Sequence, residues 1–432
     1  MDTLYSFHPL AFWRQFKKEH FAFKMACAYL ILEYVRPQSI HPELNIVPWD
    51  KIVIGLSFLA LPLDPGRHRV RDATNLWISL FGIVIIVASA LATFPAISWS
   101  HWFDFFGWYA IYFLIIFTVT TPERFFIFIA IYLLANFKLS FFGARTWAAT
   151  GFSFSSWGIH GPPGDFENSS DLSTQMLMFA PIAFELALFV KPRVKPVTYW
   201  FLMLGAVTGA MTVLGASSRG SQVALAVQAG WIAIQRKLRL RVLVGIAVVA
   251  AIGYALLPAA EKARFASAGT DNTSIQRFDY WRGGLKMIEN HPFLGVGYFN
   301  FPAVYAMQDP TKLWHGTAQL PHNIFIEVGT DAGLIGLSIF LVLIYRNLKI
   351  ARDIRRACER NANAPGYAPS IARGLAVTTW GFVIAGQFNT VAYYPFLWIN
   401  LALTVALFDI VTNVEKSRPL APVSAAVASN SG

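Results

Sequence analysis

Apolar stretches long enough to cross a lipid bilayer recur along this chain, the first beginning at Phe21 and the last ending at Val411. The core of a bilayer offers no water to backbone amides, so a crossing segment must satisfy its own hydrogen bonds, as a helix does. Only 14% of the residues are charged, whereas a typical soluble domain has about 25%. The sequence therefore excludes an ordinary soluble enzyme and predicts an all-α integral membrane protein.

The hydropathy pattern predicts about twelve membrane-spanning helices. No small-residue cleavage site closely follows the first apolar run, so we expect it to be a span and not a removable signal. No polar linker divides the runs, and residues 1–432 are expected to form a single polytopic membrane domain. The predicted spans lie near 21–37, 48–63, 75–95, 102–120, 125–142, 172–190, 197–215, 220–235, 242–258, 323–345, 373–390 and 393–412.

The distribution of positive charge predicts the orientation of these spans. With the N-terminus inside, 24 of the 35 lysines and arginines fall at the cytoplasmic ends and loops. Positive residues favour the cytoplasmic side of a membrane, so both termini are expected there. Two long segments, 144–171 and 259–322, then lie outside, and the second forms a large periplasmic loop between spans nine and ten.

The large outer loop is unusually rich in cations for that side of a membrane. Long loops escape the charge rule, so an ordinary solvated loop is one explanation, and an anion-binding site is the other. The formal charge of +11 does not indicate nucleic-acid binding, because the cations show no basic face and no aromatic platform. The six outer cations in question are Lys262, Arg264, Arg277, Arg282, Lys286 and Lys312.

One part of this loop has a helical apolar pattern. Apolar residues recur at 275, 278, 281, 285 and 288, Ser274 is a suitable N-cap, and Pro292 follows the end. We expect an amphipathic helix at the outer membrane–water interface. Gly295 and Gly297 come next, and no strand precedes them, so we assign them a packing role and not a nucleotide-binding one.

Three residues that could carry chemistry stand where predicted spans meet the outer surface: Arg219, Arg277 and His322. Ionisable groups at such depths are costly to desolvate and usually face a cavity or a partner. A snorkelling arginine and an interfacial histidine are the plainer explanations. Downstream of His322, Gly333 and Gly336 lie on one side of a helix and would let another helix approach closely.

Together these residues resemble motifs of the O-antigen ligase and polymerase superfamily of bacterial envelope glycosyltransferases. Three linked motifs occur in the order typical of that family, between about residues 215 and 340. They are Ser218-Arg219-Gly220; Arg277 and Trp281 followed by Asn290-His291-Pro292, Gly295 and Gly297; and His322-Asn323 with Gly333 and Gly336.

The resemblance implies a GT-C-like, inverting and metal-independent glycosyltransferase with a periplasmic active site in the bacterial inner membrane. Its donor would be a glycan on undecaprenyl diphosphate. Arg219 and Arg277, with Arg282 as a weaker third, would bind the diphosphate, because guanidinium groups offer a permanent charge and a forked set of donors. His322 would be the catalytic base, since imidazole titrates near neutral pH. Asn323 would support it.

Two further carboxylates, Glu327 and Asp331, stand in the span that follows His322. Facing lipid would be costly, so they are expected either to contact His322 or Arg219 and orient the base, or to be solvated at the helix end. For a metal ion, Asp165 and Glu167 are the nearest approach to a carboxylate pair, and a pair in a loop is more often simply solvated. We therefore expect no metal and no cofactor.

The first outer segment, 147–171, is dense in glycine and proline, which predicts a shaped loop that lies over the site. The leading functional hypothesis is ligation of a preassembled O-antigen to lipid A core. A repeat-unit polymerase and a protein O-oligosaccharyltransferase would use the same donor residues with another acceptor. A secondary transporter or flippase is the alternative from a different class, but the chain shows no repeated halves.

Overall fold

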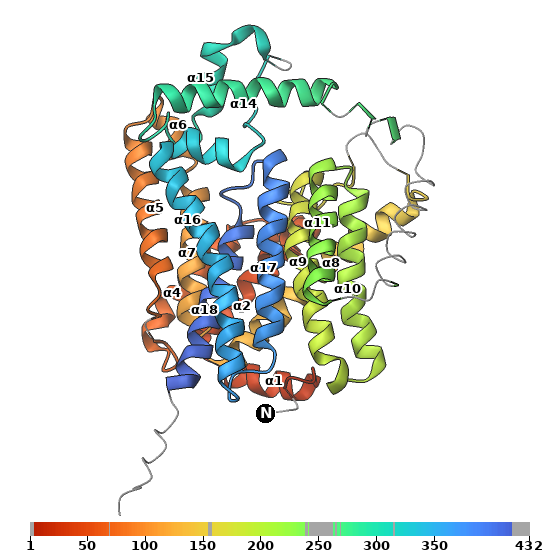
Figure 1. Ribbon diagram of the computed structural model, residues 1–432. Coiled ribbons are helices and arrows are strands. Elements are labelled where there is room, and N and C mark those ends of the chain that lie inside the picture. The colour runs from red at the N-terminus through yellow and green to blue at the C-terminus, as the bar shows by residue number, and fades with distance from the viewer. Residues whose placement is uncertain are drawn as a thin grey trace, which may run out of the picture.

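The computed structural model describes residues 4–416 apart from 69, 154–157, 238–240, 242–261, 264–265, 268 and 314–315. Its regular elements, within that part of the chain, are all helices. Most of them stand side by side in an upright bundle, and α14 and α15 lie across one end of it (Figure 1). We call this the outer end of the bundle, and the opposite end, which carries α1, the inner end.

The helices alternate between long apolar rods and short connecting turns. The α-helices are α1 (Pro9–Lys18), α2 (Phe21–Leu30), α3 (Pro37–Ile40), α4 (Trp49–Ala60), α5 (Ala73–Ala90), α6 (Pro95–Ser100), α7 (Trp102–Thr118), α8 (Pro122–Ala149), α9 (Ser169–Val190), α10 (Pro196–Gly215), α11 (Arg219–Gln235), α14 (Asn272–Asn290), α15 (Phe301–Gln308), α16 (Ile324–Arg360), α17 (Ala368–Ala385) and α18 (Pro395–Lys416). Short π- or 3₁₀-turns are η1 (Ile31–Val35), η2 (Pro42–Leu44), η3 (Leu61–Leu63), η4 (Lys191–Arg193), η5 (Pro310–Lys312) and η6 (Gly386–Phe388).

Six of the described helices are long and apolar enough to cross a membrane, which makes the chain a multi-pass helical membrane protein. They are α5, α8, α9 with η4, α10, α16 and α18, and each coincides with a predicted span. Shorter or less apolar helices occupy five other predicted positions: α2 with η1, α4, α7, α11 and α17. The predicted ninth span, 242–258, and Arg264 lie outside the described residues.

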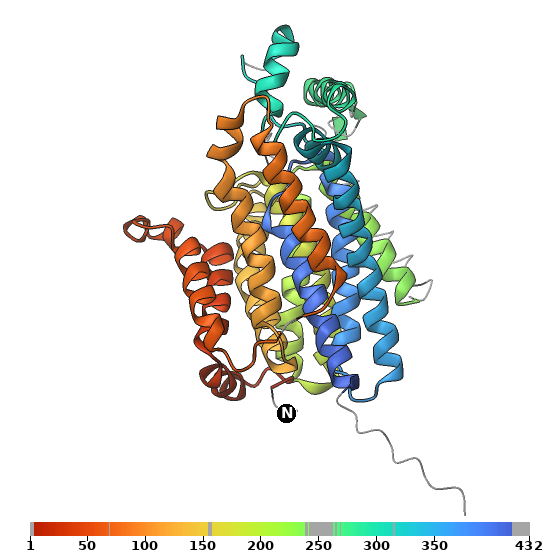
Figure 2. The ribbon, with the colours of Figure 1, turned by 90° about the vertical axis from the view of Figure 1, so that its left-hand side faces the viewer.

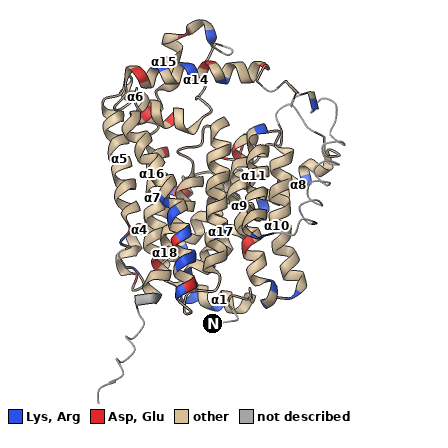
Figure 3. Cartoon of the chain, viewed as in Figure 1, with Lys and Arg blue, Asp and Glu red and all other residues tan. Residues whose placement is uncertain are grey.

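The two ends of the bundle differ in their charged residues and in the helices that lie there. α1 and the last turn of α18 lie at the inner end, whereas α14 and α15 lie at the outer end (Figure 2). Many lysines and arginines gather toward the inner end (Figure 3). This arrangement agrees with the predicted topology, in which both termini share one side and the large loop lies on the other.

Helix α14 crosses the outer end of the bundle, horizontal in Figure 1 and seen end-on in Figure 2. It begins at Asn272 and is capped by Asp271, whose side chain accepts the Ser274 backbone N–H, so the predicted cap at Ser274 is wrong. Asp is as good an N-cap as Ser and stands one turn earlier. The helix buries Tyr280, Gly283, Gly284 and Met287, while most of the predicted apolar stripe remains exposed, including Ile275, Phe278 and Leu285.

Helix α16 is broken at Gly333, which has φ 64° and ψ −166° within an otherwise helical run. Only glycine adopts this conformation readily. The break exposes backbone groups to the outer loop, and the Pro292 carbonyl accepts the Leu334 N–H while the Thr330 carbonyl accepts the Val296 N–H, each at 2.7 Å. The close approach of another helix was predicted at both glycines. It is confirmed at Gly336, which faces α5, and wrong at Gly333, which receives a loop.

The loop that packs into this break contains the two glycines assigned a packing role. A Cβ at Gly295 would collide with the Thr330 carbonyl of α16, and a Cβ at Gly297 would collide with Ala92 after α5. Both positions have φ in the left-handed region. The packing role is confirmed, and it ties the outer loop to α5 and α16.

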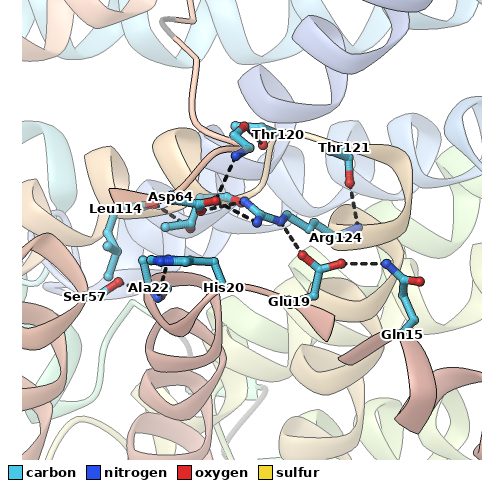
Figure 4. Close-up of polar contacts among 12 residues, drawn as sticks. Gln15, Glu19, His20, Ala22, Ser57, Asp64, Leu114, Thr120, Thr121 and Arg124 are labelled. Atoms are coloured by element: carbon cyan, nitrogen blue, oxygen red, sulfur yellow. Dashed lines mark hydrogen bonds and ion pairs between the residues drawn. The ribbon is translucent and has the colours of Figure 1, made fainter. Parts of the chain in front are cut away.

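A buried arginine joins the segments at the inner end. Arg124, 5% exposed, lies in the first turn of α8 and donates to Glu19 after α1 at 2.6 Å and to both oxygens of Asp64 at 2.7 and 2.9 Å (Figure 4). Asp64 is 2% exposed and also accepts the Gly66 N–H. One buried guanidinium therefore neutralises two carboxylates that are largely shielded from water.

Replacing Arg124 by alanine is expected to destabilise the protein by about 3–5 kcal/mol, because it leaves buried carboxylates without their partner. Thermal unfolding in detergent would measure the loss. Arg356→Ala is the matched control, since that side chain is 62% exposed on α16. Equal melting of the two variants would contradict the structural role of Arg124.

Gly333→Ala is expected to cost at least about 1–3 kcal/mol from backbone strain alone, because the position has a glycine-only conformation. A Cβ there would also collide with the backbone of Phe293. Gly230→Ala in α11 is the control, since a Cβ there meets nothing within 4 Å and a helix gains roughly 0.5–1 kcal/mol from that change. The same thermal assay applies, and a stabilising Gly333→Ala would exclude this account of the break.

Candidate functional site

A cavity of about 650 Å³ lies at the outer end and brings together three of the predicted site residues, Arg219, Arg277 and His322. We call it the arginine cavity. Its lining comes from segments far apart in the chain: the loop before α9, the start of α11, the first turns of α14, and the segment before α16. Two helices, α9 and α11, begin at this cavity, and helix N-termini favour anions. A cavity of this size can hold a small polar headgroup.

Arg219 is the first residue of α11 and is held by a carboxylate of another helix. Its Nη2 donates to Asp271 Oδ2 at 2.7 Å and lies 3.4 Å from Ser274 Oγ. Burial acts to raise the pKa of Asp271, but hydrogen bonds from Thr273, Arg219 and Ser274 hold it well below its usual range. Asp271 thus stays ionised and fixes one edge of the guanidinium, which carries five N–H donors in all. Asp271 belongs to none of the motifs found in the sequence.

The small residues beside Arg219 have a structural role. Ser217 has φ 55°, an uncommon value for a residue other than glycine. A Cβ at Gly220 would lie 2.6 Å from the ring of Phe388, so this glycine admits a side chain of the protein. Gly220 thus makes room for Phe388, whereas Ser217 and Ser218 line the arginine cavity.

Arg277 and Arg282 lie on different sides of α14. Burial, together with the positive charge of Arg219, lowers the pKa of Arg277, so the two guanidinium groups repel each other across the cavity. Arg282 does not line the cavity; its side chain is 75% exposed and pairs with Asp279 at 3.2 Å. Five residues along a helix turn the side chain by about 140°. The placement of Arg282 does not support a role as a third diphosphate contact.

His322 stands in a strained backbone position between α14 and α16. It has φ 52°, its backbone N–H donates to Thr390 Oγ1 at 2.9 Å, and its Nε2 lies 3.2 Å from Gln319 Oε1. When Nε2–H donates to Gln319, Nδ1 is the nitrogen that carries the lone pair. Burial, and secondly the charge of Arg277, lower the pKa of His322 from 6.5 to about 4. The imidazole is therefore neutral at physiological pH.

Helix α14 also positions the segment that carries His322. Trp281 Nε1 donates to the Pro321 carbonyl at 2.9 Å, and the hydroxyl of Tyr280 accepts the Gln319 N–H at 3.1 Å. Arg277 and Trp281 are one helical turn apart and share a face. This explains the spacing of the second motif: one residue lines the cavity and the other anchors the chain next to the histidine.

The predicted supporting residues are structural in the ligand-free protein. Asn323 caps α16 by accepting the Phe325 and Ile326 N–H groups, so it fixes where the helix begins after His322. Glu327 is buried and accepts the Ala392 N–H at 3.2 Å. Asp331 is buried beside Tyr393. Burial of both side chains excludes solvation at the helix end, so that expectation is wrong, whereas an orienting contact with His322 or Arg219 stays a prediction.

The glycine- and proline-rich outer segment lies at the site, as predicted. Its two carboxylates are separated: Glu167 lines the arginine cavity, whereas Asp165 lines a second cavity that also touches Gly164. Asp165 and Glu167 thus do not face one space. Within the described part of the chain, no group of three or more His, Cys, Asp or Glu side chains is placed to hold a metal ion.

The sequence interpretation missed several polar residues of the arginine cavity. They come from loop ends and share no spacing with the motifs: Asn168, Ser170, Asp171, Thr273, Gln276, Gln319 and Asn389. One signal was available, since Asn168 precedes an apolar run in the N-cap position of α9 and accepts the Ser170 N–H. The others become neighbours only through the packing of the helices.

The fold and this cavity define a multi-pass helical membrane protein with a cationic site at one end of its bundle. Residues 174–341 match a family described as O-antigen ligase, and they include Arg219, Arg277 and His322. A protein of Rickettsia felis named "Putative polysaccharide ligase" is 26% identical over 99 residues, which cover 22% of this chain and 24% of the relative. The alignment thus spans about a quarter of that relative. The chain carries an O-antigen ligase family domain, as its motifs predicted.

The pKa of His322 is a direct test of the geometry. We expect the ligand-free imidazole to titrate near pH 4, and Arg277→Gln to raise that pKa because it removes a neighbouring positive charge. Since the folded pKa lies below the unfolded one, the histidine's contribution to stability is complete above pH 6.5 and is lost as the pH falls toward 4. Nitrogen NMR of histidine-labelled protein, assigned with His322→Gln, measures the titration.

Lys286→Gln provides the control for this titration, because Lys286 is an exposed cation on the same helix and does not line the cavity. Titration of His322 near pH 6.5 in the unaltered protein would rule out its burial beside Arg277.

Proposed function

We propose that this protein is an inverting, metal-independent glycosyltransferase that moves a glycan from undecaprenyl diphosphate to an acceptor hydroxyl on the periplasmic side of the bacterial inner membrane. The observation that carries the proposal is the convergence of Arg219, Arg277 and a neutral His322 on one cavity at the outer end. The O-antigen ligase match over the same residues supports the donor class. Lipid A core is the proposed acceptor, so the reaction is O-antigen ligation.

The arginine cavity suits a leaving group that gains negative charge. In the proposed step, the acceptor oxygen forms a bond to the anomeric carbon from the face opposite the diphosphate, and the bond between that carbon and the diphosphate oxygen breaks. The electron pair leaves with the undecaprenyl diphosphate. Arg219 and Arg277 bind the departing oxygens, and preorganised charges of this kind stabilise the transition state more than the ground state.

His322 takes the acceptor proton through the ring nitrogen that carries the lone pair. A base with a pKa of about 4 is weak, but the charge of Arg277 contributes to that low value. A bound diphosphate offsets this charge and raises the pKa of the imidazole toward the working pH, where general bases are most effective. Donor binding thereby activates the base.

The repulsion between Arg219 and Arg277 points to the same ligand. Two guanidinium groups that destabilise each other in the ligand-free protein gain the most from an anion with several oxygens placed between them. Asp271 neutralises only part of this charge, since it contacts Arg219 alone among the two. A diphosphate is an anion of suitable charge.

Substitutions in the cavity test the proposed roles. We expect His322→Ala and Arg277→Gln to reduce transfer by at least about 100-fold, the typical size of a general-base or oxyanion contribution. Arg219→Lys is also expected to be poor, because an ammonium is a point charge without the fork. Transfer from purified carrier-linked glycan to lipid A core would be measured in detergent or proteoliposomes.

Lys286→Gln on α14 is the matched control for these variants and should transfer glycan normally. Wild-type activity of His322→Ala would remove the base from the proposal. Arg282→Gln should lie near the control, since that side chain faces solvent.

The acceptor is tested separately. Purified protein is incubated with undecaprenyl diphosphate-linked glycan and, in parallel, with lipid A core, a second carrier-linked unit or a pilin-like protein. Glycan gained by lipid A core supports ligation, whereas gain only by one of the other two acceptors replaces ligation by polymerisation or by protein glycosylation.

A further inference from the structure

A second cavity, also of about 650 Å³, lies next to the arginine cavity, and none of the proposed donor contacts lines it. The two cavities share Gly164 and Tyr394. They also meet along two short segments: Leu320 and Thr390 line the second cavity, while their neighbours Gln319 and Asn389 line the first. A molecule in the second cavity is therefore separated from the arginine cavity by a single layer of residues, next to His322.

The second cavity is acidic. Its lining contains two cations, Arg36 and Lys51, and five carboxyl side chains: Glu33, Asp50, Asp104, Asp165 and Glu327. We call it the acidic cavity. Carboxyl groups outnumber cations here by five to two, so an anion would be attracted less strongly than in the arginine cavity. The two substrates of a transferase could thus be distinguished by charge, with the anionic donor bound in the arginine cavity.

Aromatic rings supply much of the remaining lining. Sugars bind through two kinds of contact: their C–H faces pack on aromatic rings, and their hydroxyls donate to carboxylates, which are acceptor-only groups with several lone pairs. The acidic cavity provides both. The rings that line it include Tyr29, Trp49, Phe103, Trp108, Tyr393 and Tyr394.

Several polar atoms of this lining find no hydrogen-bond partner within the described part of the chain. They are Glu33 Oε1, Arg36 Nε and Gln38 Oε1, each with almost no exposed area. Burying such atoms without a partner is costly, and strain of this kind is kept where a function requires it. Around this cavity, two acceptor oxygens and one donor nitrogen therefore have no partner within the described part of the protein.

The outer loop brings a second carboxyl to Glu33. Asp165 lies within hydrogen-bonding reach of it, and burial raises the pKa of Asp165. Arg36 sits next to this pair, with φ 52°, and its guanidinium packs so closely on Gly164 that a Cβ there would collide with it. Phe299, which also lines the cavity, has φ 62°. Strained backbone of this kind collects at binding sites.

We propose that the acidic cavity is the acceptor-sugar site and that it selects an unphosphorylated sugar, neutral or amino-bearing, whose hydroxyls bind Glu33 and Asp165. The inference rests on the proposed transferase function. It specifies the chemistry of the acceptor end: the sugar that receives the glycan carries no phosphate, whatever phosphate groups lie elsewhere in the acceptor.

Binding of two probes tests the proposal without any transfer. The probes are core oligosaccharides of one sequence, one with phosphate on the terminal sugar and one dephosphorylated, titrated calorimetrically into the full-length protein in detergent with and without EDTA. We expect the dephosphorylated probe to bind at least about tenfold more tightly, and Glu33→Gln or Asp165→Asn to weaken its binding by roughly tenfold, since hydrogen bonds to the buried carboxyl pair are lost.

A charge reversal at the rim provides a variant that leaves the buried pair intact. Asp104 is exposed, and Asp104→Lys is expected to improve binding of the phosphorylated probe and so reduce the difference in affinity between the two probes. Glu43→Lys is the matched control, because Glu43 is exposed on the same outer segment as the start of α4 and does not line the cavity. Equal binding of the two probes, or equal effects of the two rim variants, would overturn the proposal.

Two further outcomes separate this inference from its premise. Loss of binding in EDTA would assign the carboxylates to a bridging cation and overturn the proposal. Undecaprenyl diphosphate binding, measured in parallel, should be unchanged in Glu33→Gln. If the selective sugar binding is found but no acceptor ever gains glycan, the sugar site stands and the transferase function fails. If glycan is transferred but the two probes bind equally, the transferase function stands and the sugar site fails.

Discussion

The contact between Arg219 and Asp271 holds the outer end of the protein together. Asp271 caps α14 and at the same time binds the first residue of α11, so the crosswise helix cannot shift without breaking an ion pair and an N-cap. From that fixed position α14 carries Arg277 into the cavity, and Trp281 anchors the chain beside His322. A guanidinium that would bind an anion is thus also the attachment point of the helix that completes the site.

The site depends on charges that are separated by very little protein. On one side of Gly164 and Tyr394, the charge of Arg219 lowers the pKa of Arg277 and the charge of Arg277 lowers the pKa of His322, while carboxyl groups collect on the other side. In water such charges would be screened over a few ångströms of solvent, but a cavity wall of low dielectric preserves the difference. The proposed division between an anionic donor and an unphosphorylated acceptor sugar follows from this separation.

Much of the fold could be predicted because the apolar runs are long and a bilayer permits little besides helices. Arg219, Arg277 and His322 could be grouped because the motifs occur together, and the structure brings them to one cavity. The pairing of Asp271 with Arg219 could not be predicted, since 52 residues separate them and periodicity says nothing about contacts over that distance along the chain. Arg282 was overvalued although the helical repeat already turns it away from Arg277.

The acidic cavity was invisible to sequence reasoning for a related reason. Its carboxyl groups come from five separate segments, and each alone resembles an ordinary polar residue near a helix end.

Uncommon backbone conformations have a consequence for how the protein tolerates change. Arg36, Ser217, Phe299 and His322 all have left-handed φ values, and all four line one of the two cavities. Each such residue costs of order 1–3 kcal/mol, so the residues around the two cavities lower the free energy of unfolding. Substitutions that remove this backbone strain would raise thermal stability, but each would also change the shape of a cavity.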